Sequence, residues 1–247
     1  MCDHPEQLVT GWAGWVPPAQ SRARYKPLGD WLDLSHPIDE RTPRVAFFPP
    51  PQVKRLRSLP EDRLNVTQMS MVVHIGTHVD APIHLFGDAS AMQEIPLERL
   101  TGAGYVLPVD IPGSGLIEPV HLEAARGKIS AGEILLLNTG IHRLAYSDAY
   151  EDHPALSLAA AQWLVDQGIK MIAVDFATPD TAVMHRDASF DYPIHRQLLG
   201  HGVLIAEHVT NLDALNAQRV EIMCAALNLT HADGAPVRLM ARSIIDI

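Results

Sequence analysis

The stretch "HIGTHVDAPIH", residues 74–84, places its chemically reactive side chains on alternate positions. These are His74, His78, Asp80 and His84, and the odd-numbered positions between them are apolar apart from one threonine. A helix is disfavoured, because the stretch contains a glycine, a proline and several β-branched residues. Strict alternation over this length is typical of a β-strand, so we expect a strand with one polar face.

A flat strand cannot bring His74 and His78 to one metal ion. Four residues of strand span about 13 Å, whereas each imidazole nitrogen has to come within about 2.1 Å of a shared ion. Gly76 lies between them and is the residue type that permits a bend. We therefore predict a bend at Gly76 that lets His74, His78 and Asp80 converge on a metal. An exposed strand face carrying unrelated histidines is the alternative.

Short runs rich in Val, Ile and Leu recur along the chain and predict further strands. The clearest runs cover 69–75, 104–111, 133–140, 170–177 and 202–209, and 219–229 and 236–246 are less regular. Asp233-Gly234, between the last two runs, is a hairpin signal. Helices are expected at 118–127, 157–168 and 193–202, where Ser157 is a candidate N-cap.

Strands outnumber helices, and the helices lie between strands. This order predicts an α/β fold with a mixed sheet or open β-barrel flanked by helices, and argues against an all-parallel doubly wound sheet. With 247 residues and 47% hydrophobic content, we expect one domain over residues 1–247. Residues 1–30 are expected to form an N-terminal extension.

Composition excludes several classes of function. The formal net charge of −10 argues against nucleic acid as a partner, because binding a polyanion needs a basic face. No apolar run approaches the roughly 20 residues that a membrane helix needs. Cys2 and Cys224 suggest neither a disulfide framework nor a thiolate metal site. The first residues do not resemble a signal peptide, so we expect a cytoplasmic protein.

The stretch 74–84 matches the pattern H-x-G-T-H-x-D-x-P-x-H, and the sequence thereby resembles the metal-dependent cyclase-like hydrolases. That family includes bacterial kynurenine formamidase, isatin hydrolase and a trans-dienelactone hydrolase. Further stretches resemble the family in the right order: "LDLSHPID" (32–39), "EILLLNTG" (133–140), "VDFATPD" (174–180), "PIHRQLLGHGVLIAEHVTNLDAL" (193–215) and "DGAPVRLMA" (233–241). The resemblance implies a swivelling β/β/α-like fold and a homodimer or homotetramer.

The resemblance also implies roles for matched positions. His74, His78 and Asp80 would be metal ligands, and His84 would be a general acid/base beside the metal. His195 and Glu207 match the late pair that completes a second metal position in the formamidase branch. From the residues alone, Glu207 could instead form a buried salt bridge, and His195 could lie on a helix surface.

The implied activity is hydrolysis of a small amide, lactam or lactone by metal-activated water. A side chain such as histidine, with an ordinary pKa near 6.5, can take or return the proton. Zinc is the first choice of cofactor, manganese the second, with one or two ions per chain. Kynurenine formamidase proper and a catalytically silent metal-binding protein remain alternatives.

Two sets of neighbouring residues are harder to assign. Aromatic side chains that could surround the substrate, or equally pack in the core or a dimer, are Trp12, Trp15, Trp31, Phe47 and Phe48. Strand alternation places His208 on the face opposite Glu207, so we expect His208 to lie outside the site.

Overall fold

The structure is a computed structural model that describes residues 9–15 and 24–247. Much of the expected N-terminal extension, residues 1–30, lies outside the described residues. Within the described part, Val9 and Trp12 pack against the apolar cluster that contains Leu135 and Leu137. Trp15 packs against a second apolar cluster, which contains Ile134 and Leu136.

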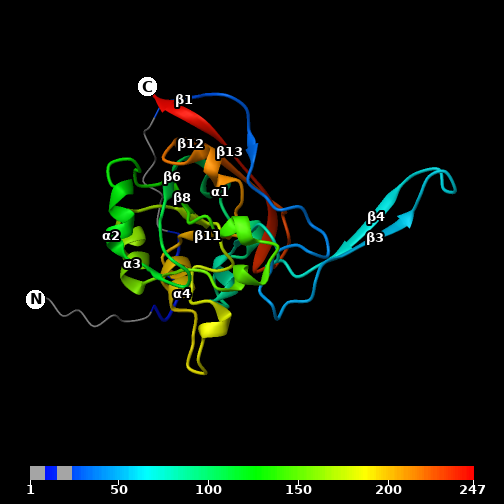
Figure 1. The fold of residues 1–247 in the computed structure, drawn as a ribbon, viewed down its shortest axis with the longest axis horizontal. Coiled ribbons are helices and arrows are strands. Elements are labelled where there is room, and N and C mark those ends of the chain that lie inside the picture. The colour runs from blue at the N-terminus through cyan, green and yellow to red at the C-terminus, as the bar shows by residue number, and fades with distance from the viewer. Residues whose placement is uncertain (1–8, 16–23) are drawn as a thin grey trace, which may run out of the picture.

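Seven strands form a closed barrel (Figure 1). In ring order they are β5 (His78–Asp80), β13 (Gly234–Asp246), β12 (Arg219–Ala226), β6 (Thr101–Pro108), β8 (Ile134–Asn138), β10 (Met171–Val174) and β11 (Leu204–Glu207). Strands β6, β8, β10 and β11 run parallel, and the other pairings are antiparallel. The predicted mixed sheet is therefore confirmed, and it closes because the short strand β5 pairs with both β11 and β13.

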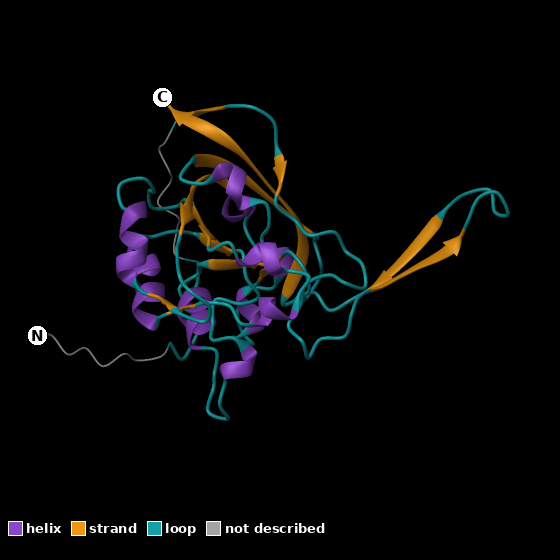
Figure 2. Cartoon of the chain, in the orientation of Figure 1, coloured by secondary structure: helices purple, strands orange, loops and turns teal. Residues whose placement is uncertain are grey.

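Alternation along the central strands builds two apolar layers. In β8, Ile134 and Leu136 belong to the layer inside the barrel, whereas Leu135 and Leu137 belong to the layer that faces the helices. Helices α3 (Leu158–Asp166) and α4 (Pro193–Gly200) cover that outer layer on one side of the barrel (Figure 2). Because the central strands are buried on both faces, their sequences are continuously apolar and do not alternate.

The predicted helices are confirmed at the expected positions. Ser157 caps α3, where its side chain accepts a hydrogen bond from the backbone N–H of Ala160. Pro193 occupies the first turn of α4, where a missing N–H costs nothing. The segment 118–127 forms α2 (Pro119–Leu122) followed by a 3-10 turn, Glu123–Ala125. A further short helix, α1 (Leu97–Leu100), precedes β6.

The remaining elements lie around the barrel. Strands β1 (Tyr25–Pro27) and β2 (Leu32–Asp33) pair with β13, and β7 (Leu116–Ile117) pairs with β9 (Ala155–Leu156). Strands β3 (Gln52–Arg57) and β4 (Val66–Ser70) form a hairpin that projects away from the body (Figure 1). The other 3-10 turns are Pro82–His84, Met92–Glu94, Ile141–Leu144, Asp148–Glu151, Val183–His185 and Leu212–Leu215. Among the described residues, no helix is both long and apolar enough to cross a membrane.

The stretch 69–80 differs from a single strand. Strand β4 ends at Ser70 and β5 begins at His78, so most of the predicted run 69–75 is irregular. The predicted bend is present, because Gly76 has a φ of 62° and donates a hydrogen bond to the carbonyl of Pro43. A Cβ on Gly76 would lie 2.6 Å from Cγ2 of Thr42. The bend therefore needs glycine both for its conformation and for its space.

Asp233-Gly234 also differs from the expectation. Strands β12 and β13 form the expected antiparallel pair. However, residues 227–233 connect them, so Asp233 and Gly234 end a longer connection and do not form a tight two-residue turn. This position brings Asp233 next to β5, where the backbone N–H of Ala81 donates to its carbonyl.

Candidate metal centre

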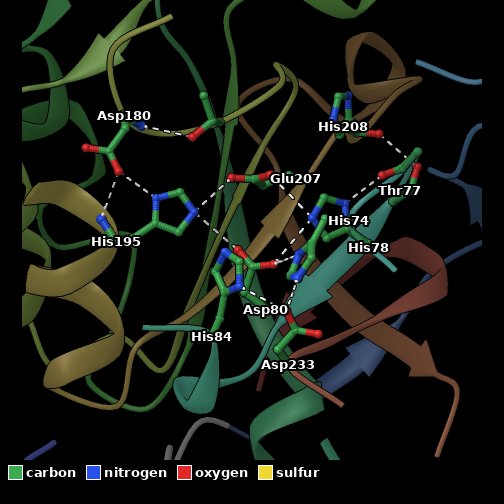
Figure 3. A network of polar contacts seen from close by, with 12 residues as sticks. His74, Thr77, His78, Asp80, His84, Asp180, His195, Glu207, His208 and Asp233 are labelled. Carbon is green, nitrogen blue, oxygen red and sulfur yellow. Dashed lines mark hydrogen bonds and ion pairs between the residues drawn. The ribbon is translucent and has the colours of Figure 1, made fainter. Parts of the chain in front are cut away.

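The register of β5 and β11 places three polar side chains on one face of the barrel wall. His78 is opposite Glu207, and Val79 is opposite Ala206. Val79 and Ala206 belong to the inner apolar layer. His78, Asp80 and Glu207 therefore point to the outer side, where His195 of α4 faces the carboxylates of Asp80 and Glu207 (Figure 3).

His78 is held so that one ring nitrogen is free to bind. Its Nδ1 lies 2.8 Å from the carbonyl oxygen of Gly76, which makes Nδ1 the donor in a neutral ring. Its Nε2 lies 3.3 Å from both Asp80 Oδ1 and Glu207 Oε2. The backbone bend at Gly76 thus supplies the hydrogen bond that fixes the orientation of the ligand.

His195 approaches the same carboxylates from α4. Its Nδ1 lies 2.5 Å from Asp180 Oδ2, and its Nε2 lies 3.3 Å from Asp80 Oδ2 and from Glu207 Oε1. Asp180 also accepts the backbone N–H groups of Ile194 and His195 in the first turn of α4. His195 is buried and not on a helix surface, and a carboxylate orients it as in many metal sites.

Three buried polar atoms in this cluster make no hydrogen bond within the described residues: His78 Nε2, Asp80 Oδ2 and Glu207 Oε1. Buried polar groups normally have a partner. Ligand atoms of His74, His78 and Asp80 lie within 4.8 Å of one another, and so do those of Asp80, His195 and Glu207. The residues present therefore fit one or two divalent ions.

His74 and His84 meet at Asp233, which the sequence reasoning did not identify. Asp233 Oδ2 lies 2.9 Å from His74 Nε2 and 3.2 Å from His84 Nδ1. The ring centroids of the two histidines are 4.1 Å apart. The dipeptide Asp233-Gly234 was visible in the sequence, but only as a turn signal. Gly234 is needed here, because a Cβ on it would lie 2.7 Å from Cε1 of His74.

The remaining ring nitrogen of His74, Nδ1, lies 2.8 Å from Asp80 Oδ1. Protonated imidazoles and ionised carboxylates hold the cluster together. Burial lowers the pKa of His78, but Asp80 and Glu207 outweigh burial and raise it to about 10. Burial and Asp80 raise the pKa of Glu207, but His195 and His78 outweigh them and lower it to about 2. The carboxylates of Asp80 and Glu207 are therefore stabilised by positive charge. A bound metal ion would supply that charge in place of the protons on the imidazoles.

His208 lies beside the site, contrary to the prediction from alternation. Strand β11 ends at Glu207, and His208 has a φ of 53°, so the alternation does not continue. The His208 ring lies 5.8 Å from that of His78, and its Nδ1 lies 2.8 Å from the hydroxyl of Tyr150. The two rings lie on the same side of Glu207 in Figure 3. Burial lowers the pKa of His208 to about 3, so the ring is neutral.

A cavity of about 220 Å³ opens onto these residues. Its lining is Val45, Phe47, Phe48, His74, Asp80, His84, Leu85, Thr178, Arg186, Tyr192, His195 and Glu207. Phe47 and Phe48 are thus at the site. Trp12 and Trp15 are half-buried and pack against the two apolar clusters, and Trp31 lies under the guanidinium of Arg242. The volume is below the roughly 300–1,000 Å³ of pockets for drug-sized ligands, which indicates a small substrate.

Comparison with known proteins agrees with this geometry. The model of the Cyclase family matches residues 32–181. The chain is 31% identical over 222 residues to the kynurenine formamidase of Bacillus cereus, covering 87% of this chain and 98% of that protein. It is 30% identical over 221 residues to the kynurenine formamidase of Bacillus mycoides, with the same coverage.

Solved structures share the fold. An isatin hydrolase bound to the product analogue thioisatinate has a TM-score of 0.77 at 20% identity, covering 88% of this chain and 93% of that chain. Isatin hydrolase A from Labrenzia aggregata has a TM-score of 0.77 at 22% identity, with coverage of 88% and 94%. A potential metal-dependent hydrolase with cyclase activity has a TM-score of 0.70 at 25% identity, with coverage of 86% and 96%. The chain therefore belongs to the Cyclase family, the metal-dependent cyclase-like hydrolases that the motif at 74–84 predicts.

Proposed function

We propose that this protein is a metal-dependent hydrolase of a small aryl amide. One observation carries the proposal: His78 Nε2, Asp80 Oδ2 and Glu207 Oε1 are buried and make no hydrogen bond within the described residues, beside a cavity with aromatic walls. The kynurenine formamidase relatives support an amide as the bond that is cleaved. Zinc is the first candidate ion, because imidazole and carboxylate ligands suit it, and manganese is the second.

His74, His78, Asp80, His195 and Glu207 would hold the ion or ions. A bound divalent ion would polarise the amide carbonyl and make a water molecule nucleophilic near neutral pH. The chain itself supplies the rest of the chemistry. Phe47 and Phe48 form the apolar wall against which an aryl ring can pack.

His84 is the candidate proton carrier. Its side chain is 25% exposed and lines the cavity. Its Nδ1 faces Asp233, and its Nε2 makes no hydrogen bond within the described residues. Nε2 is therefore free to deliver a proton to the leaving nitrogen. Asp233 holds the ring in the orientation that this transfer requires.

To test this, the purified protein is assayed with N-formylkynurenine, formanilide and isatin, before and after its metal is removed. We expect hydrolysis of at least one formamide, loss of activity with a chelator, and recovery on adding zinc or manganese. N-formylkynurenine as the preferred substrate would identify a kynurenine formamidase proper. A metal-loaded protein that turns over none of them would instead support a silent metal-binding protein.

We also propose a homodimer or homotetramer. The projecting β3–β4 hairpin supports this, because it exposes the apolar side chains of Val53, Leu56 and Met69. Native mass spectrometry of the purified protein should show an even number of chains, and a monomer at micromolar concentration would contradict the proposal.

A further inference from the structure

Arg186 lies in the wall of the catalytic cavity, and the metal chemistry does not require it. It follows the 3-10 turn Val183–His185 in the segment between β10 and α4. Among the residues that line the cavity, Arg186 is the one arginine or lysine. The floor of the same cavity holds the carboxylates of Asp80 and Glu207, so the cavity has negative charge at the metal site and positive charge at Arg186.

The guanidinium is held in place by contacts that leave most of its donors free. Its Nε donates to the carbonyl of Thr181 at 2.7 Å. Its Cζ lies 4.2 Å from the centroid of the Phe190 ring and 5.2 Å from that of Tyr192. In the described part of the chain, no aspartate or glutamate forms an ion pair with it. A guanidinium has five N–H donors, so the two terminal nitrogens remain available to a ligand.

The backbone of Tyr192 gives an independent reason to assign a function to this wall. Tyr192 has a φ of 50°, which is unfavourable for a bulky side chain. Such strain persists where the surrounding structure imposes it, often at binding sites. The strained conformation places the Tyr192 ring 6.0 Å from His195, at an interplanar angle of 88°, while Arg186 lies over the same ring. Tyr192 therefore connects the guanidinium to the metal site.

We propose that Arg186 binds a carboxylate on the substrate, so that the substrate is an anionic aryl amide. This inference rests on the proposed amide hydrolysis and names its substrate class. A planar guanidinium stacked on aromatic rings is well suited to bind a carboxylate with two parallel hydrogen bonds. The net charge of the protein, −10, repels an anion. Arg186 offsets that repulsion at the cavity.

The experiment compares two aryl formamides that differ in one charge: 2-formamidobenzoate and formanilide. We expect Arg186→Gln to lower kcat/KM for 2-formamidobenzoate by about tenfold or more, mainly through KM, because a charge-assisted hydrogen bond is lost. For formanilide we expect a change within about twofold. Arg186→Lys should give an intermediate loss, because it keeps the charge without the planar pair of donors.

Arg196→Gln is the matched control. Arg196 lies in the neighbouring helix α4, stacks over Phe86 at 5.9 Å and pairs with Asp191, but does not line the cavity. It should not change the preference between the two formamides. Equal losses for both substrates in Arg186→Gln would show a merely structural role for Arg186. An unchanged kcat/KM for 2-formamidobenzoate would equally overturn the proposal.

A binding measurement separates this inference from the proposed function. If wild-type protein hydrolyses neither formamide, the proposed function fails, but calorimetric titration with benzoate and benzamide still tests Arg186. We expect benzoate to bind more tightly than benzamide, and Arg186→Gln to remove that difference. Equal affinities in wild-type protein would contradict carboxylate recognition even if both formamides are hydrolysed.

Discussion

Asp233 Oδ2 lies between His74 and His84, 2.9 Å from Nε2 of the first and 3.2 Å from Nδ1 of the second. One carboxylate thus orients a predicted metal ligand and the predicted proton carrier. Hydrogen bonds from His74 and His84 outweigh burial and hold the pKa of Asp233 far below its usual value. The carboxylate is therefore ionised at any pH at which the protein is expected to work.

Asp233→Asn should lower kcat by about tenfold to a hundredfold, the usual cost of removing a group that orients a ligand or catalytic histidine. The amide keeps the shape of the side chain but loses the charge that positions both rings. The variant should keep most of its metal, because Asp233 belongs to neither of the two candidate groups that contain Asp80, although it forms a further group with His74 and His84. Steady-state kinetics and metal analysis of the same preparation check both parts. An unchanged kcat would show that Asp233 does not position His84.

His84→Ala should retain metal and lose about a hundredfold to ten-thousandfold in kcat, because it removes proton transfer and leaves the metal cluster intact. The altered pH profile of the residual activity should separate this effect from a loss of folding. Loss of metal from His84→Ala would instead make His84 a ligand, which would contradict its assigned role.

Asp180→Asn should weaken metal binding by about tenfold to a hundredfold, because Asp180 orients His195 from behind. Calorimetric titration of the metal-free protein with zinc measures the change in affinity. Asp187→Asn is the control, since Asp187 is exposed and its carboxylate bonds only to Ser189 among the described residues. Equal zinc affinity in the two variants would argue against His195 as a ligand.

Gly76→Ala should reduce the free energy of unfolding by more than the roughly 1 kcal/mol that separates alanine from glycine in a left-handed conformation. The added methyl group would also lie 2.6 Å from Cγ2 of Thr42. Gly113→Ala isolates the conformational part, because Gly113 has a φ of 51° and a Cβ added there would meet no heavy atom within 4 Å among the described residues. Denaturant unfolding of both variants tests this, and equal losses would show that the contact with Thr42 is not what requires glycine at 76.

Local sequence signals predicted the parts of the fold that local physics determines. The apolar run 133–140 became β8, and Ser157 caps α3, because burial and capping act over a few residues. The bend at Gly76 followed from a conflict between strand length and metal geometry. The closure of the barrel did not follow, because it depends on pairing β5 with β13, which is about 150 residues away in the chain.

The site was predicted to a similar extent and for the same reason. The dense stretch 74–84 supplied candidate ligands, and the structure brings these side chains together. Asp233 was not predicted, because it lies 149 residues from His84 and its sequence suggested only a turn. His208 was misplaced because strand alternation was assumed to continue, whereas its backbone is left-handed. Arg186 has no local pattern at all, because only the folded chain places it in the cavity wall.

The most direct test of the central claim is the metal content of the purified protein, measured by mass spectrometry without added metal or chelator. We predict one or two equivalents of zinc or manganese per chain, and two equivalents would support His195 and Glu207 as ligands. Asp80→Ala should lose the metal, and Glu207→Gln gives a second variant in case the first does not fold. Active protein without a stoichiometric metal ion, or unchanged metal content in both folded variants, would contradict the assignment of this cluster as a metal centre.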